Sequence, residues 1–191
     1  AKFSADLSGT LNDLQTNNLK LTTSTKTKIY GDINFKNLFN KEENNFYMNG
    51  VFSNLTSTYK DLKSLLPNVL GEAIPTSFDR LGRFTIVGNS QVTASKVIAD
   101  ISIETDLGFV DSNLEINKIN DIDNAQYKGK IEFKEFDFGI FLEDSNVGIA
   151  SLDFDVKGSG FITETIDTQV TGDVFEIEYN NYNYKDIKVA G

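Results

Sequence analysis

Two distant stretches of the chain carry the same strand pattern: Ile29-Tyr30-Gly31-Asp32-Ile33-Asn34-Phe35-Lys36-Asn37-Leu38 and Tyr127-Lys128-Gly129-Lys130-Ile131-Glu132-Phe133-Lys134-Glu135-Phe136. Both read x-Gly-x-Ile-x-Phe-Lys-x-apolar. Because side chains alternate between the two faces of a strand, the Gly, Ile and Phe of each copy lie on one face and the charged and amide groups on the other. The pattern predicts repeated strands with one apolar face, which some further element or ligand must cover.

The same alternation recurs along the chain. Ala99 to Glu104 and Ala150 to Gly158 alternate apolar or small residues with charged or hydroxyl residues. Further strands are predicted at residues 2–9, 18–23, 27–38, 45–57, 83–93, 108–117, 125–135, 165–179 and 182–190. Turn-forming Asn, Asp, Gly, Ser and Thr separate them. The fold class is therefore mainly β, with repeated antiparallel strands forming a long sheet.

Asparagine pairs mark some of the predicted corners. Asn17-Asn18, Asn44-Asn45 and Asn180-Asn181 suit the positive φ angles that short hairpin loops need. One segment departs from the strand pattern: residues 58–82 begin with a capping Thr58, continue with leucines at helical spacing and contain both prolines, Pro67 and Pro75. We expect a helical insertion there, with a second short helix through Val69, Leu70, Ile74, Phe78 and Leu81. Residues 137–142 fit either a helical turn or an apolar loop.

Composition excludes several classes of function. The chain has 191 residues, 18 Lys and Arg, 28 Asp and Glu, and a net charge of −10. Nucleic acid is not an expected partner, because phosphate binding needs clustered basic residues. The absence of His and Cys removes Ser-His-Asp, Cys-His and thiolate or imidazole metal chemistry. The alternation runs to both ends of the sequence, and we expect residues 1–191 to be a single β-repeat domain excised from a longer protein.

Acidic clusters give weaker signals. Asp121-Ile122-Asp123-Asn124 and Glu143-Asp144-Ser145-Asn146 offer oxygen ligands, but neither has the acidic alternation and central Gly of a calcium loop. The pairs Asp153/Asp155 and Glu176/Glu178 resemble glycosidase carboxylates, yet each pair is predicted on a solvent face and the chain has no Trp to stack sugars. We predict no catalytic residue, no metal site and no cofactor.

Ordered strand and turn motifs resemble one known family. They are Tyr59-Lys60-Asp61-Leu62, Leu65-Leu66-Pro67-Asn68-Val69-Leu70-Gly71, Leu81-Gly82-Arg83-Phe84-Thr85-Ile86-Val87-Gly88-Asn89, Thr105-Asp106-Leu107-Gly108-Phe109, Tyr127-Lys128-Gly129, Phe136-Asp137-Phe138-Gly139, Val147-Gly148, Ser151-Leu152-Asp153-Phe154-Asp155-Val156 and the tail from Tyr179 to Gly191. In their order and number these motifs resemble the TamB family of AsmA-like bridge-like lipid transfer proteins, in versions from Bacteroidota.

The resemblance implies a half-pipe of β-sheet, polar outside and apolar inside, that conducts phospholipid tails across the periplasm. It implies an inner-membrane anchor and an outer-membrane barrel partner of the TamA type, both through regions outside this sequence. The residues independently offer an apolar lining, and we expect these to face lipid: Ile33, Phe35, Val97, Ala99, Ile101, Ile103, Ile131, Phe133, Leu152, Phe154 and Val156.

A second interpretation is open at this point. The same inward residues would serve a closed β-sandwich, used as a structural or adhesive module of a secreted or surface protein. The two interpretations differ in whether the apolar face stays accessible or is sealed by a second sheet. In either case, exposed edge strands would favour edge-to-edge self-association.

Overall fold

The structure is a computed structural model that describes residues 2–38, 45–65, 76–121, 123–161 and 166–191. Its strands are β1 (Lys2–Thr10), β2 (Asp13–Thr22), β3 (Lys28–Lys36), β4 (Tyr47–Thr58), β5 (Arg83–Thr93), β6 (Lys96–Thr105), β7 (Gly108–Asn117), β8 (Gln126–Asp137), β9 (Val147–Ser159), β10 (Asp167–Tyr179) and β11 (Tyr182–Ala190). Its helices are α1 (Tyr59–Leu65), the 3-10 helix η1 (Thr76–Leu81) and α3 (Phe138–Leu142).

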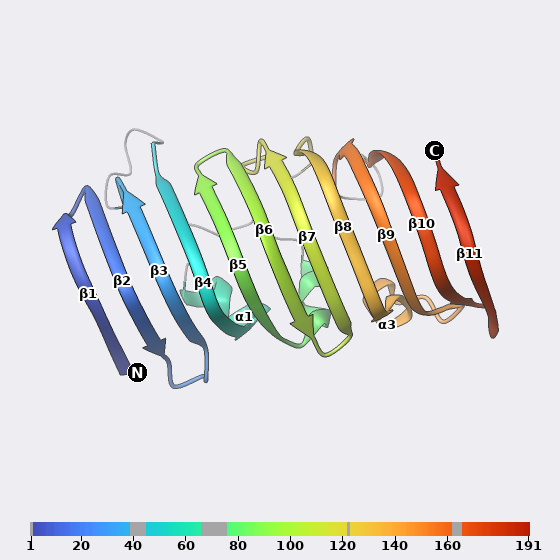
Figure 1. Cartoon of the computed structure of the whole chain (residues 1–191), viewed down its shortest axis with the longest axis horizontal. Coiled ribbons are helices and arrows are strands. Elements are labelled where there is room, and N and C mark those ends of the chain that lie inside the picture. The colour runs from blue at the N-terminus through green and yellow to red at the C-terminus, as the bar shows by residue number, and fades with distance from the viewer. Residues whose placement is uncertain (1, 39–44, 66–75, 122, 162–165) are drawn as a thin grey trace.

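All eleven strands form one antiparallel sheet in chain order, from β1 to β11 (Figure 1). Each strand from β2 to β10 pairs with the one before it and the one after it, as expected for hairpins joined end to end. The predicted mainly β, antiparallel fold is thus confirmed. The sheet is open: within the described residues β1 and β11 are its two edges, and no second sheet closes over it as in a sandwich.

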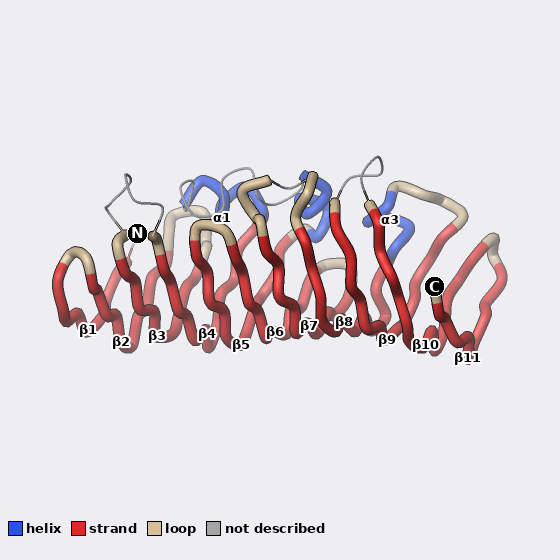
Figure 2. Tube along the Cα trace, turned by 90° about the horizontal axis from the view of Figure 1, so that it is seen from above, coloured by secondary structure: helices blue, strands red, loops and turns tan. Residues whose placement is uncertain are grey.

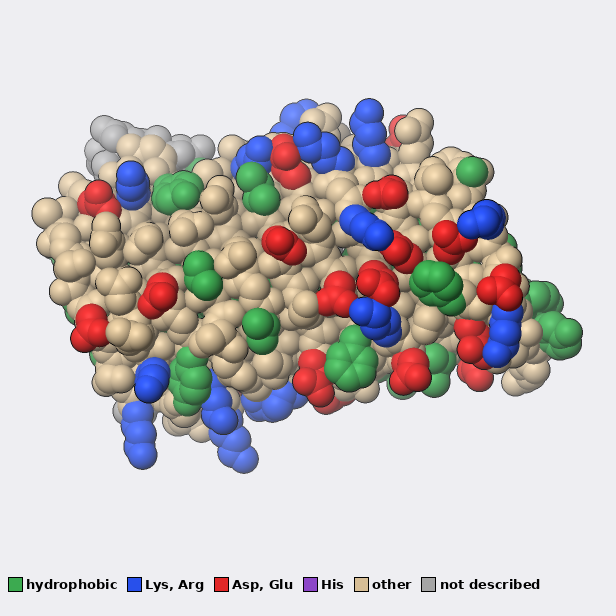
Figure 3. Space-filling model, in the orientation of Figure 1, with side chains coloured by type: hydrophobic (Ala, Val, Ile, Leu, Met, Phe, Trp, Pro, Cys, Tyr) green, Lys and Arg blue, Asp and Glu red, His purple; other side chains and the backbone are tan. Residues whose placement is uncertain are grey.

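The sheet is curved rather than flat. Figure 2 looks nearly along the strands, and their middles lie lowest while their ends rise on both sides, with the helices above. The concave face therefore carries the helices, and the convex face is the one turned to the viewer in Figures 1 and 3. Because paired residues share a face, the register assigns every strand residue to one side.

The glycine shared by the two repeated strands has a clear structural role. Gly31 and Gly129 have φ angles of 153° and 141°. A Cβ atom would lie 2.0 Å from the carbonyl oxygen of Val51 at position 31 and 2.0 Å from that of Asn113 at position 129. Only glycine lets the neighbouring strand approach this closely.

One predicted hairpin corner is wrong. Asn17 and Asn18 lie inside β2, which starts at Asp13 rather than at residue 18, and form a β-bulge there. Asn18 does have a positive φ of 54°, but its backbone N–H donates to Asp32 Oδ1 at 2.8 Å and its side chain to Asp6 Oδ2 at 2.9 Å. These two carboxylates hold the bulge within a continuous strand.

The other asparagine corners have different outcomes. Asn180 and Asn181 have φ angles of 51° and 60° and join Tyr179 to Tyr182, which confirms a two-residue turn. Asn44 lies outside the described residues.

Helices occur where the strand pattern breaks. The insertion at 58–82 contains α1 and η1, and residues 137–142 form α3, capped by Asp137, whose Oδ1 accepts the N–H of Ile140 at 2.9 Å. Of the predicted second helix, Phe78 and Leu81 lie in η1, whereas Val69, Leu70 and Ile74 lie outside the described residues.

Candidate functional site

The concave face carries an unbroken line of apolar side chains. Following paired residues from strand to strand gives one apolar residue from each of the eleven strands: Phe3, Leu21, Ile29, Leu55, Ile86, Ile103, Val110, Phe133, Leu152, Val174 and Ile187. We call this set the apolar row. At about 4.8 Å between strands it extends for roughly 48 Å.

All eleven predicted lipid-facing residues lie on this face. Ile103, Phe133 and Leu152 belong to the apolar row, and the others occupy parallel rows beside it, such as Ile101, Ile131 and Phe154. Ile33 and Leu152 are buried and the remaining nine are half-buried. The half-buried side chains of these parallel rows stay partly accessible to solvent. Together with the apolar row, they widen the apolar part of the concave face.

Several lining residues escaped the sequence analysis because bulges reverse the alternation. In β4, Met48 and Phe52 face the concave side. The register shifts between Phe52 and Leu55, and beyond that shift Leu55 and Ser57 face the concave side. The same reversal occurs in β8, where Phe133 and Phe136 both point inward although they are three residues apart. A pattern that allows the alternation to shift by one residue once in each strand would predict these lining residues.

The two ends of the sheet leave apolar concave side chains open to solvent. Phe3 and Leu7 of β1 are 61% and 57% exposed, and Tyr182 and Tyr184 of β11 are 64% and 44% exposed. The central strands are better covered by their neighbours on both sides. The apolar surface therefore reaches both edges of the sheet.

The helices line one rim of the concave face. The chain ends of β4 and β8 lead into α1 and α3, and η1 leads into β5, so all three lie at the lower strand ends in Figure 1. The Arg80 guanidinium donates to the Phe141 carbonyl at 2.7 Å and pairs with Glu143 at 2.7 Å, and the rings of Phe78 and Phe141 meet edge to face. This contact ties η1 to α3. Leu62, Leu81 and Phe136 extend the buried cluster beneath it.

The convex face carries the cross-strand ion pairs, together with exposed apolar residues such as Val87 and Phe109. Figure 3 shows this face with scattered hydrophobic side chains and with charges gathered over β6 to β11. Lys130 pairs with Asp153 at 2.8 Å and Lys134 with Asp111 at 2.9 Å, each across two adjacent strands. Bonds from Ser102 and Lys134 lower the pKa of Asp111 below its ordinary value. These pairs place charged groups on the outer face, where water can solvate them.

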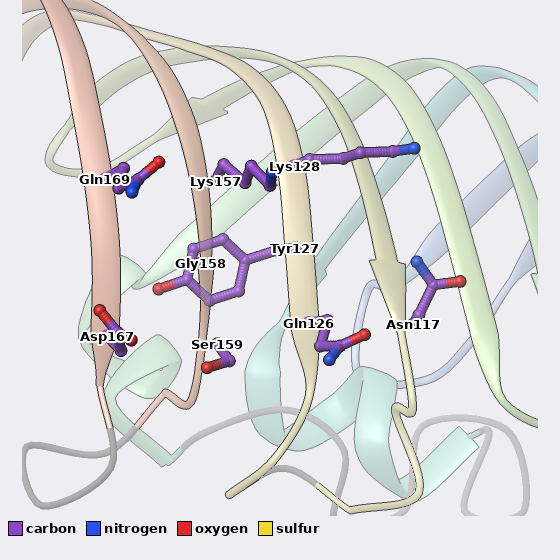
Figure 4. Close-up of a pocket in the computed structure, with 9 residues that line it drawn as sticks. All are labelled: Asn117, Gln126, Tyr127, Lys128, Lys157, Gly158, Ser159, Asp167 and Gln169. Atoms are coloured by element: carbon purple, nitrogen blue, oxygen red, sulfur yellow. The ribbon is translucent and has the colours of Figure 1, made fainter.

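A hollow of about 460 Å³ lies at the upper ends of β7 to β10 (Figure 4). Most of its lining is polar, with the ring of Tyr127 packed 4.8 Å from that of Phe161 and its hydroxyl bonded to Thr168. The lining residues are Asn117, Gln126, Tyr127, Lys128, Lys157, Gly158, Ser159, Asp167 and Gln169. Such a lining does not suit an acyl chain, so we place the candidate site on the concave face instead.

The acidic pairs considered for catalysis lie among partners of opposite charge or amides. Asp153 pairs with Lys130, and Glu176 accepts from Asn183 and pairs with Lys185 at 3.2 Å, which lowers the pKa of Glu176. Across the described part of the chain no group of three or more Asp or Glu side chains is arranged to hold a metal ion. Asp144 instead accepts hydrogen bonds from Asn146.

Comparison with known proteins adds no identification. No protein-family model, no curated protein and no solved structure matches this chain. Among the described residues, no helix has the length and apolar character needed to cross a membrane.

Proposed function

We propose that this chain is a lipid-conducting β-groove segment, which carries acyl chains along its concave face without chemical conversion. The observation that carries the proposal is the apolar row, which crosses all eleven strands while the opposite face stays ion-paired. A half-buried apolar face on one side and a wetted face on the other is what a lipid path in water requires.

The energetic need for such a path is large. Moving an acyl tail of about sixteen carbons into water costs on the order of 10 kcal/mol, at about 0.8 kcal/mol per methylene. A tail reaches about 15 Å, half the hydrocarbon core of a bilayer. The roughly 48 Å of the apolar row would therefore keep a tail in contact with apolar side chains over several tail lengths.

The proposed setting follows the resemblance to TamB-like proteins. There the groove works in the periplasm, between an inner-membrane anchor and an outer-membrane barrel partner, and supports phospholipid transport for outer-membrane assembly. The polar convex face fits an aqueous compartment of this kind.

Two substitutions on one strand test the groove. Ile101 of β6 faces the concave side, and Ile98 of the same strand faces the convex side and is 37% exposed. We expect Ile101→Asp to weaken binding of a fluorescent fatty acid at least tenfold, because a carboxylate in the lining repels the tail. Ile98→Asp should leave the affinity within about twofold, since it adds the same charge outside the groove.

Folding is checked separately by circular dichroism. Ile101→Ser serves as a milder variant, because Ser112 already lies directly opposite Ile101 and the concave face holds a hydroxyl there. Equal loss of binding in the Ile98 and Ile101 variants, or no binding by the parent protein, would refute the groove.

A further inference from the structure

A group of lysines that form no ion pair with any described residue lies at one corner of the convex face. Lys2 and Lys28 flank Thr22 in one cross-strand row of β1, β2 and β3, and Lys20 lies two residues from Thr22 on the same face. Lys26 lies in the turn that joins β2 to β3. All four lysines are exposed. We call Lys2, Lys20, Lys26 and Lys28 the lysine patch.

The patch differs from the β6 to β11 part of the sheet in its lack of ion pairs. Most lysines of those strands pair with carboxylates, as in Lys96–Glu115 at 2.8 Å and Lys188–Asp173 at 2.6 Å, with Lys157 as an exception among the described residues. Among the described residues, no lysine of the patch forms an ion pair. Their cross-strand partners are hydroxyl residues instead, namely Ser4, Thr22, Tyr30 and Thr56.

The nearest carboxylates along these strands hydrogen-bond to an asparagine rather than to a lysine. The cross-strand partners of Lys20 are Ser4 and Tyr30. Asp6 lies two residues from Ser4 and Asp32 two residues from Tyr30, and both carboxylates accept hydrogen bonds from Asn18. The patch therefore combines four lysines, which outnumber the two carboxylates beside them, with hydroxyl groups able to donate to an anion.

Apart from Asp6 and Asp32, most acidic side chains of the convex face lie several strands away from the patch. From β3 to β9 the sheet spans six strand spacings, or about 29 Å. This is roughly three times the Debye length of about 8–10 Å at physiological salt. Although the net charge is −10, an approaching anionic surface at this corner meets the lysines first. Figure 3 shows basic side chains extending from the lower corner of the sheet at its β1 end.

An exposed aromatic group accompanies the charge. Phe3 follows Lys2 on the edge strand, points to the concave side and is 61% exposed, and Leu7 on the same side is 57% exposed. Basic side chains beside an exposed aromatic residue are the composition that binds the interface of an anionic bilayer.

We propose that the lysine patch is a docking site for an anionic lipid surface, which brings the β1 end of the sheet against a membrane. The phosphate groups of the lipids take the place of the missing carboxylates, and Phe3 contacts the boundary between headgroups and acyl chains. The lysines lie on the convex face, and Phe3 is the residue of the apolar row at the β1 edge. The contribution of the lysines therefore does not depend on the proposed groove.

Vesicle co-flotation tests the site with two charge-matched variants of the full chain. The patch variant carries Lys2→Gln, Lys20→Gln and Lys28→Gln. The control carries Lys36→Gln, Lys118→Gln and Lys157→Gln, three exposed lysines that also form no ion pair among the described residues and lie outside the patch. Vesicles are phosphatidylcholine alone or with about one third phosphatidylglycerol.

We expect the parent protein to bind only the anionic vesicles, and more weakly as salt rises. The patch variant should lose on the order of a hundredfold in binding, about fivefold per lysine, and the control less than about threefold. Ile101→Ser should bind vesicles like the parent, which separates this site from the groove.

Three results would overturn the proposal. The first is an equal loss of vesicle binding in the two triple variants, and the second is equal binding of the parent protein to neutral and anionic vesicles. The third is displacement of the protein from vesicles by inorganic phosphate or duplex DNA at matched ionic strength, which would indicate a small-anion or nucleic-acid site.

Discussion

At the scale of single residues, glycines set how closely neighbouring strands approach. Gly129 combines a φ of 141° with a neighbouring carbonyl oxygen 2.0 Å from where a Cβ would lie. Gly129→Ala should therefore lower the free energy of unfolding by about 2 kcal/mol or more, measured by urea denaturation. Gly191→Ala is the matched control, because nothing lies within 4 Å of its Cβ position. Equal stability of the two variants would contradict the strained geometry at position 129.

Charged residues of the convex face give a pH dependence. Glu115 bonds to Lys96 Nζ at 2.8 Å, to Asn117 and to Lys128, which lowers its pKa from 4.5 to about 2. Because the folded pKa is lower than the unfolded one, the stabilising contribution is complete above about pH 4.5 and is lost as the pH falls towards 2.

Glu115→Gln should therefore flatten the fall in urea midpoint between pH 4.5 and pH 2, while changing stability most at neutral pH. An unchanged pH profile in this variant would show that the Lys96–Glu115–Lys128 contacts do not persist in solution.

At the scale of elements, the rim depends on an aromatic cluster. Phe136 is 1% exposed and its ring lies 5.0 Å from Phe133 and Phe138 and 5.6 Å from Phe141. Phe136→Ala should cost about 3–5 kcal/mol in the free energy of unfolding, because it leaves a cavity where β8 meets α3.

Phe109→Ala provides the control for that measurement. Phe109 lies on the convex face and is 48% exposed, and its loss should cost no more than about 1 kcal/mol. A similar cost for both residues would mean that the aromatic cluster does not stabilise the rim.

Strands that keep one phase of alternation were predictable from the sequence. β6 and β9 show the inward residues that period-two alternation indicates, and Asp137 before an apolar run allowed a helical turn at α3. Strand β2 was not predicted in full, because the bulge at Asn18 reverses its phase and Asn17-Asn18 has the composition of a turn. Bulges depend on side chains of neighbouring strands, here Asp6 and Asp32, which a local pattern does not include.

At the scale of the whole molecule, alternation indicated which residues share a face but left the shape of the sheet open. The same inward residues fitted a sealed sandwich. Only the arrangement of all eleven strands in chain order within one curved sheet distinguishes an open groove from a sandwich. The apolar row likewise needs the register of ten strand pairs, since residues such as Phe3 and Ile187 belong to it only through their partners.

The central claim is that acyl chains contact the concave face and not the convex one. Photo-crosslinking with a diazirine-bearing fatty acid, followed by peptide mass spectrometry, tests it on the unmodified protein. We predict adducts on the concave residues Ile101, Ile131 and Phe154. The convex residues Val87 and Phe109, which are 46% and 48% exposed, should stay unlabelled despite their greater exposure. Labelling that follows exposure, with Val87 and Phe109 modified first, would contradict the account.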